Sequence, residues 1–109
     1  MANVYKNAKV DFTTTDNTTV YTSPSNSRAI LKSILVSDDS GSGDSINVTL
    51  TDASAAVFSL FKTKAVSANA TEELISQPII LQESEILKAQ ATTAGRLHMV
   101  VSLLEINRD

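Results

Sequence analysis

The chain lacks most of the residue types on which reactive sites are built. It has no cysteine, no tryptophan, one histidine, three glycines and two prolines among its 109 residues. Without cysteine, disulfides and thiolate ligands play no part, and the sequence gives no indication of a redox compartment. The aromatic residues are only two tyrosines and three phenylalanines. Carbohydrate-cleaving clefts are usually lined with aromatic side chains, so this scarcity disfavours them.

Clustered positive charge and long apolar runs are also missing. The net charge is −3, and the basic residues are scattered singly, whereas nucleic-acid-binding surfaces gather them beside aromatics. The longest apolar stretch, residues 99–104, is interrupted by Ser102, and a membrane-spanning helix needs about 20 apolar residues. The first residues show no apolar core of a signal peptide. We therefore expect no nucleic-acid partner, no membrane partner and synthesis in a cytosol.

What the chain does contain is a period of two. In residues 46–51, Ile46, Val48 and Leu50 alternate with Asn47 and Thr49, the pattern of a half-buried strand. Similar runs, separated by clusters of Ser, Thr, Asn and Asp, recur at residues 18–22, 28–37, 57–64, 79–81, 86–91 and 97–106. This spacing predicts an all-β fold, an antiparallel β-sandwich of about eight strands.

Two segments depart from simple alternation. In residues 28–37, Leu31 fits one face while Ile34 and Val36 fit the other, which predicts a β-bulge near Lys32 and Ser33. Residues 66–75 contain alanine and glutamate, which favour a helix. Their helical period is poor and strands flank them, so we expect a loop and a short strand.

The two ends of the chain supply the candidate subunit contacts. Residues 1–15 are compatible with an edge strand or with an arm ordered by a neighbouring subunit, leaving residues 16–109 as the sandwich domain. The last strand is apolar on both faces, so both need a cover, from a neighbouring subunit or from a loop or the N-terminal arm of the same chain. The candidate contact residues are Val4, Tyr5, Val10, Phe12, Val100, Leu104 and Ile106.

No set of side chains predicts a catalytic, cofactor or metal site. His98 lies within a strand, and the sequence marks no partner for it. The loop of residues 38–44 is rich in Asp, Ser and Gly and is the first place to look for a bound cation. It lacks the twelfth-position glutamate of an EF-hand, however, because Thr49 stands there. The remaining glutamates are expected to be turn and edge charges. We expect no cofactor and no enzymatic activity.

Four stretches carry a family resemblance. They are VYTSP at residues 20–24 followed by KSI at 32–34, INVTL at 46–50, PIILQESEILKA at 78–89 and VSLLEI at 101–106. Together they resemble small virion proteins of tailed bacteriophages and prophages. The chain departs from that group at Ser84 and Glu85, where the group usually has Gly-Asp.

The resemblance implies a jelly-roll-like structural protein of the virion, made in the host cytoplasm. The favoured role is capsid decoration or cement, in which the protein bridges subunits of the major capsid protein as a homo-oligomer, a trimer being favoured by lattice geometry. Two alternatives stay open. One is a tail, neck or fibre component that recognises a host surface, and the other is a carbohydrate- or cation-binding module that uses the 38–44 loop.

Overall fold

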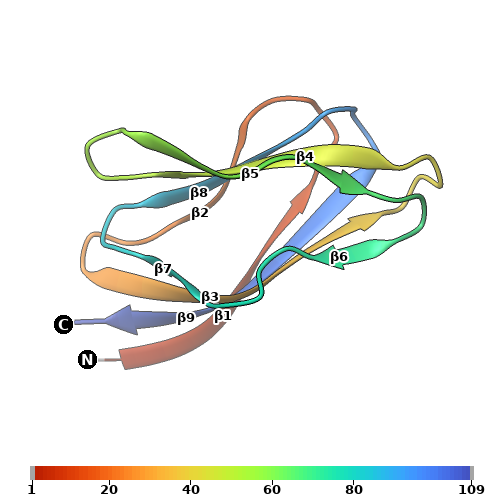
Figure 1. The fold of residues 1–109 in the computed structure, drawn as a ribbon. Helices are drawn as coiled ribbons and strands as arrows, with labels where there is room; N and C mark the ends of the chain where they lie inside the picture. The colour runs from red at the N-terminus through yellow and green to blue at the C-terminus, as the bar shows by residue number, and fades with distance from the viewer. Residues whose placement is uncertain (1, 109) are drawn as a thin grey trace.

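The computed structural model describes residues 2–108, which form nine β-strands and no helix (Figure 1). The strands are β1 (Ala2–Asp11), β2 (Thr18–Thr22), β3 (Ser27–Asp38), β4 (Asp44–Thr51), β5 (Val57–Val66), β6 (Thr71–Glu73), β7 (Ile79–Leu81), β8 (Ile86–Ala91) and β9 (Leu97–Asn107). The predicted all-β class is confirmed.

The strands form two antiparallel sheets packed face to face (Figure 1). The first sheet has the order β1-β9-β3-β6, with β7 also pairing with β3, and the second has the order β2-β8-β4-β5. If β6 and β7 are counted as two halves of one interrupted strand, each sheet has four strands. The chain passes between the sheets after almost every strand. This is the arrangement of a double-sheet jelly roll.

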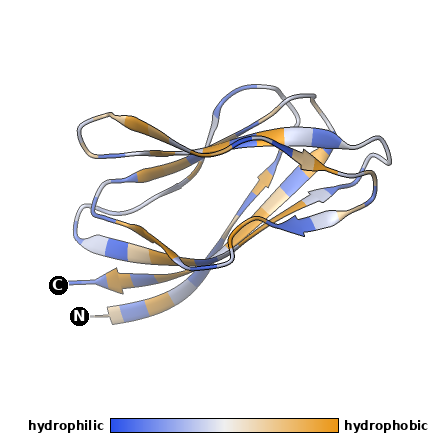
Figure 2. Ribbon diagram, in the orientation of Figure 1, coloured by the Kyte–Doolittle hydropathy of each residue, from blue (hydrophilic) through white to orange (hydrophobic). Residues whose placement is uncertain are grey.

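The core lies between the sheets and is filled by every second residue of the strands. In β9, Leu97, Met99, Val101 and Leu103 are each at most 1% exposed, while the residues between them face outward. The alternating bands along the strands in Figure 2 show the same division. Because one face of each sheet is buried, a shift of one residue in the register would turn the apolar side chains of a strand outward.

The predicted β-bulge in β3 is confirmed. Leu31 lies opposite Leu103 and Ser33 lies opposite Ser102, so Lys32 is an extra residue on the β3 side of the ladder. The extra residue restores the inward direction after Leu31, and Ile34 therefore also reaches the core. Leu31, Ile34 and Val36 thus belong to the same core face, and the bulge accounts for the break in their alternation.

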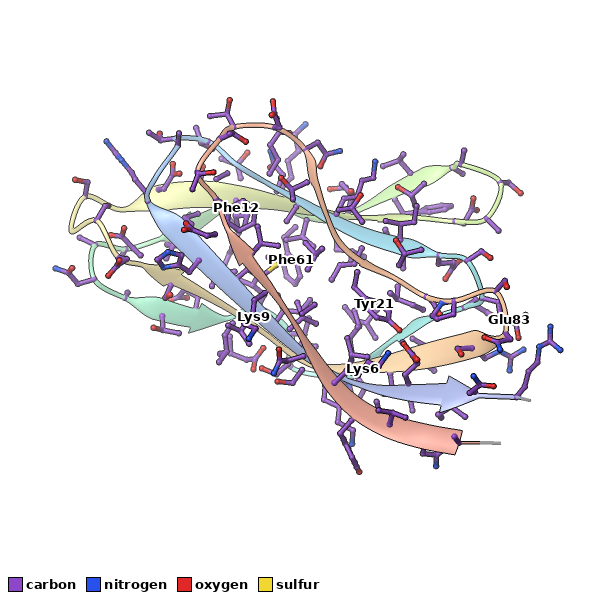
Figure 3. All side chains as sticks on the ribbon, turned by 180° about the vertical axis from the view of Figure 1, so that it is seen from behind. Lys6, Lys9, Phe12, Tyr21, Phe61 and Glu83 are labelled. Carbon is purple, nitrogen blue, oxygen red and sulfur yellow. The ribbon has the colours of Figure 1, made fainter. Side chains whose placement is uncertain are left out.

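The N-terminal residues form the edge strand β1. It pairs with β9 over its whole length, from Ala2 opposite Asn107 to Asp11 opposite His98. Just beyond β1, the backbone N–H of Phe12 donates to the carbonyl of Leu97 at 3.1 Å, and the side chain is buried between the sheets (Figure 3).

Residues 66–75 form a loop and the short strand β6, as expected from their poor helical period. In the turn between β7 and β8, Ser84 has a φ of 67°, in the left-handed region that favours glycine. The Gly-Asp of the resembling proteins therefore corresponds to a turn that this chain keeps without glycine.

Candidate interaction surface

The outer face of the first sheet carries a row of apolar side chains that crosses four strands. Tyr5 of β1 lies opposite Leu104 of β9, Leu104 lies opposite Ile30 of β3, and Ile30 lies opposite Ile80 of β7. Tyr5 is 76% exposed and Ile80 is 58% exposed, while Leu104 and Ile30 are half-buried. We call these four residues the apolar row.

Further apolar groups flank the apolar row. Val100 and Leu35, directly opposite each other on β9 and β3, are 38% and 39% exposed. On the other side, Ile106 is half-buried and lies opposite Arg28. These flanking groups extend the apolar surface along β9 and β3.

Two hollows lie on this face. The first, about 320 Å³, is lined by Tyr5, Asn7, Lys32 and Ser102 among others, and the Lys32 ammonium lies 6.0 Å from the centre of the Tyr5 ring. The second, about 300 Å³, is lined by Arg28, Glu83, Ile106 and Arg108. In it, Arg108 Nε donates to Glu83 Oε2 at 2.8 Å.

The outer face of the second sheet is different in character. Its outward residues on the central strands β4 and β8 are mainly polar, for example Asn47 opposite Gln90 and Thr49 opposite Lys88. A separate exposed apolar pair, Val57 and Phe58, begins β5 just after the β4–β5 turn and is 64% and 54% exposed.

The residues predicted as subunit contacts divide into two groups. Tyr5, Val100, Leu104 and Ile106 lie on the outer face of the first sheet, and the structure brings them together there. The other three, Val4, Val10 and Phe12, have the opposite orientation.

Those three face the space between the sheets because they share the inward parity of Ala8 in β1. Phe12 is 1% exposed and Val10 packs against the core, whereas Val4 keeps 43% exposure near the end of β1. Phe12 is committed to this chain's own core, so its use as a subunit contact is withdrawn. The sequence reasoning missed Ile30 and Ile80, although Ile79, Ile80 and Leu81 form a run that is apolar on both faces.

A polar cluster of Lys6, Tyr21 and Glu105 joins the two sheets. The hydroxyl of Tyr21 in β2 donates to Glu105 Oε2 at 2.5 Å, and Lys6 Nζ donates to Glu105 Oε1 at 3.1 Å. Figure 3 shows Lys6 and Tyr21 close to each other near the middle of the view. Hydrogen bonding from Tyr21 and then from Lys6 lowers the pKa of Glu105 despite its burial, while burial and the Glu105 charge raise the pKa of Tyr21. This explains how Lys6 is accommodated on an inward-facing position.

His98 lies on the outer face and pairs with a carboxylate that the sequence did not indicate. Its Nε2 is 3.1 Å from Asp11 Oδ1, because the two residues are directly opposite across β1 and β9. Both side chains are largely exposed to solvent. On its other side His98 lies opposite Ser37 of β3, but within residues 2–108 no hydrogen bond joins these two side chains.

Asp38 organises the 38–44 loop through hydrogen bonds to its carboxylate. Asp38 Oδ1 accepts hydrogen bonds from the backbone N–H and the hydroxyl of Ser40 at 2.9 and 2.6 Å. Its Oδ2 accepts from the N–H groups of Gly43 at 2.8 Å and Asn69 at 3.0 Å. These donors, those of Ser40 first, hold the pKa of Asp38 well below its usual range. Asp38 is 5% exposed, and its carboxylate accepts all four of these hydrogen bonds.

Glu73 and Glu85, two of the glutamates expected to be turn and edge charges, have structural partners. The Glu73 carboxylate accepts hydrogen bonds from the Ser33 hydroxyl and from the Ile34 N–H, the latter at 2.8 Å. Glu85 accepts from the Gln82 N–H at 2.8 Å within its turn. Across residues 2–108, no three His, Cys, Asp or Glu side chains gather in a way that could hold a metal ion.

Within residues 2–108 there is no helix long and apolar enough to cross a membrane. No protein-family model and no curated protein matches this chain. A solved structure described as "Bacillus endospore appendages form a novel family of disulfide-linked pili" is similar over 98% of this chain and 89% of its own, with a TM-score of 0.58 and 10% sequence identity. At that identity, the likeness concerns the fold alone.

Proposed function

We propose that this protein is a non-enzymatic structural protein that attaches to a larger particle through the outer face of the first sheet. The observation that carries this proposal is the difference between the two outer faces, one crossed by the apolar row and the other mainly polar. Exposed apolar groups that are continuous across strands mark interaction surfaces. The interior, by contrast, is filled by the chain's own side chains.

The particle we propose is a phage head, on which the protein serves as a capsid decoration or cement protein. The sequence resemblance to virion proteins supports this choice, and trimers on the three-fold positions of a shell suit the symmetry. The protein would stabilise the head because it binds the assembled lattice of major capsid protein and not its separate subunits. The fold likeness to a pilus protein is compatible with an assembly role. Disulfide linkage is not available to this chain, since it has no cysteine.

The test is to mix the purified chain with empty shells of its own virus that lack it, and to measure co-sedimentation and copies bound. We expect saturable binding of many copies distributed over the shell, and an increase in the shell's disruption temperature. Absence of binding contradicts the proposal. Deletion of the N-terminal segment would be a poor test, because it removes Phe12 from the core as well as Tyr5 from the surface.

A second candidate, a tail, neck or fibre component, is favoured by one observation. Phe58 and Val57 are exposed beside the β4–β5 turn, where a contact with a host surface would be accessible. This role predicts a few copies at one vertex or on the tail, and loss of adsorption to the host in Phe58→Ser. Labelling the chain in intact virions and imaging its position separates the two roles.

A further inference from the structure

We propose that the surface that covers the apolar row belongs to another protein and is acidic, with aliphatic side chains at its centre and carboxylates around them. This inference rests on the proposed function, because it specifies the partner of the same face. It follows from the charges on the face and from where the two hollows place them.

The cations on this face outnumber the carboxylates. Arg28 and Lys32 of β3 and Lys9 of β1 are exposed, and within residues 2–108 none of them forms an ion pair. Three carboxylates also lie on the face: Glu83 is paired with Arg108, Asp11 lies beside His98, and Glu73 accepts hydrogen bonds from Ser33 and Ile34. The four cations, Lys9, Arg28, Lys32 and Arg108, exceed these three carboxylates by one, whereas the whole chain has a net charge of −3. The face therefore differs in sign from the rest of the molecule, and its cations without an ionic partner are Lys9, Arg28 and Lys32.

The hollows put these cations on opposite sides of the apolar row. Lys32 borders the first hollow beside Tyr5, and Arg28 borders the second beside Ile106. In the second hollow Arg108 is paired with Glu83, so Arg28 is the guanidinium left for an incoming group. Ammonium and guanidinium groups next to apolar surface are well suited to partner carboxylates, which they hold with charge-assisted hydrogen bonds.

A second copy of the chain is a poorer occupant of this face. In a two-fold contact the same patch meets itself, so the excess of cations on one copy would face the same excess on the other. Like charges brought together in this way oppose binding. The complementary surface thus has the opposite sign, and we assign it to a different protein, which in the proposed function is the capsid lattice.

The experiment measures the affinity of the full chain for empty shells of its virus at low and high salt. We expect Arg28→Glu with Lys32→Glu to weaken binding by about tenfold or more at low salt, with a smaller loss at high salt, because salt screens exposed charges. The matched control is Lys62→Glu with Lys64→Glu on β5 of the second sheet, which changes the net charge equally and should leave affinity unchanged. For the apolar row, Ile80→Ser should weaken binding, whereas the similarly exposed Val57→Ser should not. All variants alter exposed side chains, and thermal unfolding verifies that they fold.

The outcomes separate this inference from the proposed function. If the wild-type chain binds shells but the Arg28 and Lys32 reversal binds as tightly as the control, the acidic partner is wrong while the decoration role stands. If the wild-type chain fails to bind, both are withdrawn. If sedimentation of the chain alone shows self-association that strengthens with salt and is lost in Tyr5→Ser, the occupant is a second copy and the inference is overturned.

Discussion

At the scale of single residues, the most informative positions are those where a non-glycine residue adopts a backbone conformation that favours glycine. Ala55, Thr63, Asn69 and Ser84 all have positive φ without being glycine. Ser84 is exposed, and its turn is held by backbone hydrogen bonds, the N–H of Ser84 to the carbonyl of Ser23 at 3.0 Å and that of Glu85 to Gln82 at 3.1 Å. The turn is therefore determined by its surroundings and not by the serine.

Replacing Ser84 with glycine should stabilise the protein. A left-handed conformation costs a non-glycine residue about 1–2 kcal/mol, which the glycine variant avoids. The greater freedom of glycine in the unfolded chain offsets about 0.5–1 kcal/mol of this stabilisation. We expect Ser84→Gly to raise Tm by about 3–5 °C, measured by thermal unfolding. Ser76→Gly is the control, since Ser76 is exposed without positive φ. It should lower Tm slightly, and an equal rise in both variants would contradict the explanation.

At the scale of elements, most strands were predictable because their side chains report which face is buried. Residues 18–22, 79–81 and 86–91 have the bounds expected from alternation alone, and β3, β5 and β9 extend by one or two residues. What alternation does not reveal is the pairing between distant strands. Whether Ile80 lies next to Ile30 depends on the β3–β7 register, and no local pattern encodes it.

The bulge gives a prediction at this scale. Because Lys32 is the extra residue between Leu31 and Ser33, deleting it should leave a regular ladder in which Leu31 and Ile34 still face the core. We expect the Lys32 deletion to remain folded, as judged by circular dichroism and a cooperative unfolding transition.

Deletion of Leu35 is the matched control, because it also removes one exposed residue from β3. It would turn either Val36 or the Leu31–Ile34 segment away from the core, and each buried aliphatic side chain lost costs about 2–5 kcal/mol. Unfolding of the Lys32 deletion, or normal stability of the Leu35 deletion, would show that the bulge does not set the register.

At the scale of the whole molecule, two carboxylates couple folding to pH. The pKa values of Asp38 and Glu105 are both lowered in the folded protein. Their stabilising contribution is therefore present above the unfolded pKa, about 4 for both types, and is lost as pH falls through the folded values. We expect the free energy of unfolding, measured with urea, to fall as the solution is acidified below about pH 4.

Two variants test whether Asp38 and Glu105 cause this loss of stability in acid. Asp38→Asn and Glu105→Gln should each be less stable than wild type near neutral pH and should show a flatter decline in acid. Asp39→Asn, at an exposed neighbour of Asp38, should follow the wild-type profile. If all three profiles coincide with wild type, other groups control the acid transition.

The interaction surface was only partly predictable for a reason that also belongs to this scale. Val100, Leu104 and Ile106 stand out in the sequence because β9 is apolar on both faces, and Tyr5 joins them through pairing with Leu104. Phe12 shows the opposite case, since an apolar residue in the N-terminal segment is as well suited to its own core as to a neighbour. The basic character of the face was hidden, because Lys9 is far in sequence from Arg28 and Lys32 and joins them only when β1, β9 and β3 pair.

The interruption between β6 and β7 has a consequence for local opening. One side of β3 is protected along its length by β9, whereas the other side is covered by two strands of three residues each. Segments with few hydrogen bonds open at lower free energy than the surrounding structure. Amide hydrogens of residues 71–73 and 79–81 should thus exchange with deuterium before those shared by β3 and β9. When β6 and β7 detach, β3 becomes an unprotected sheet edge. Strand exchange between molecules would therefore begin at β3 under mild heating.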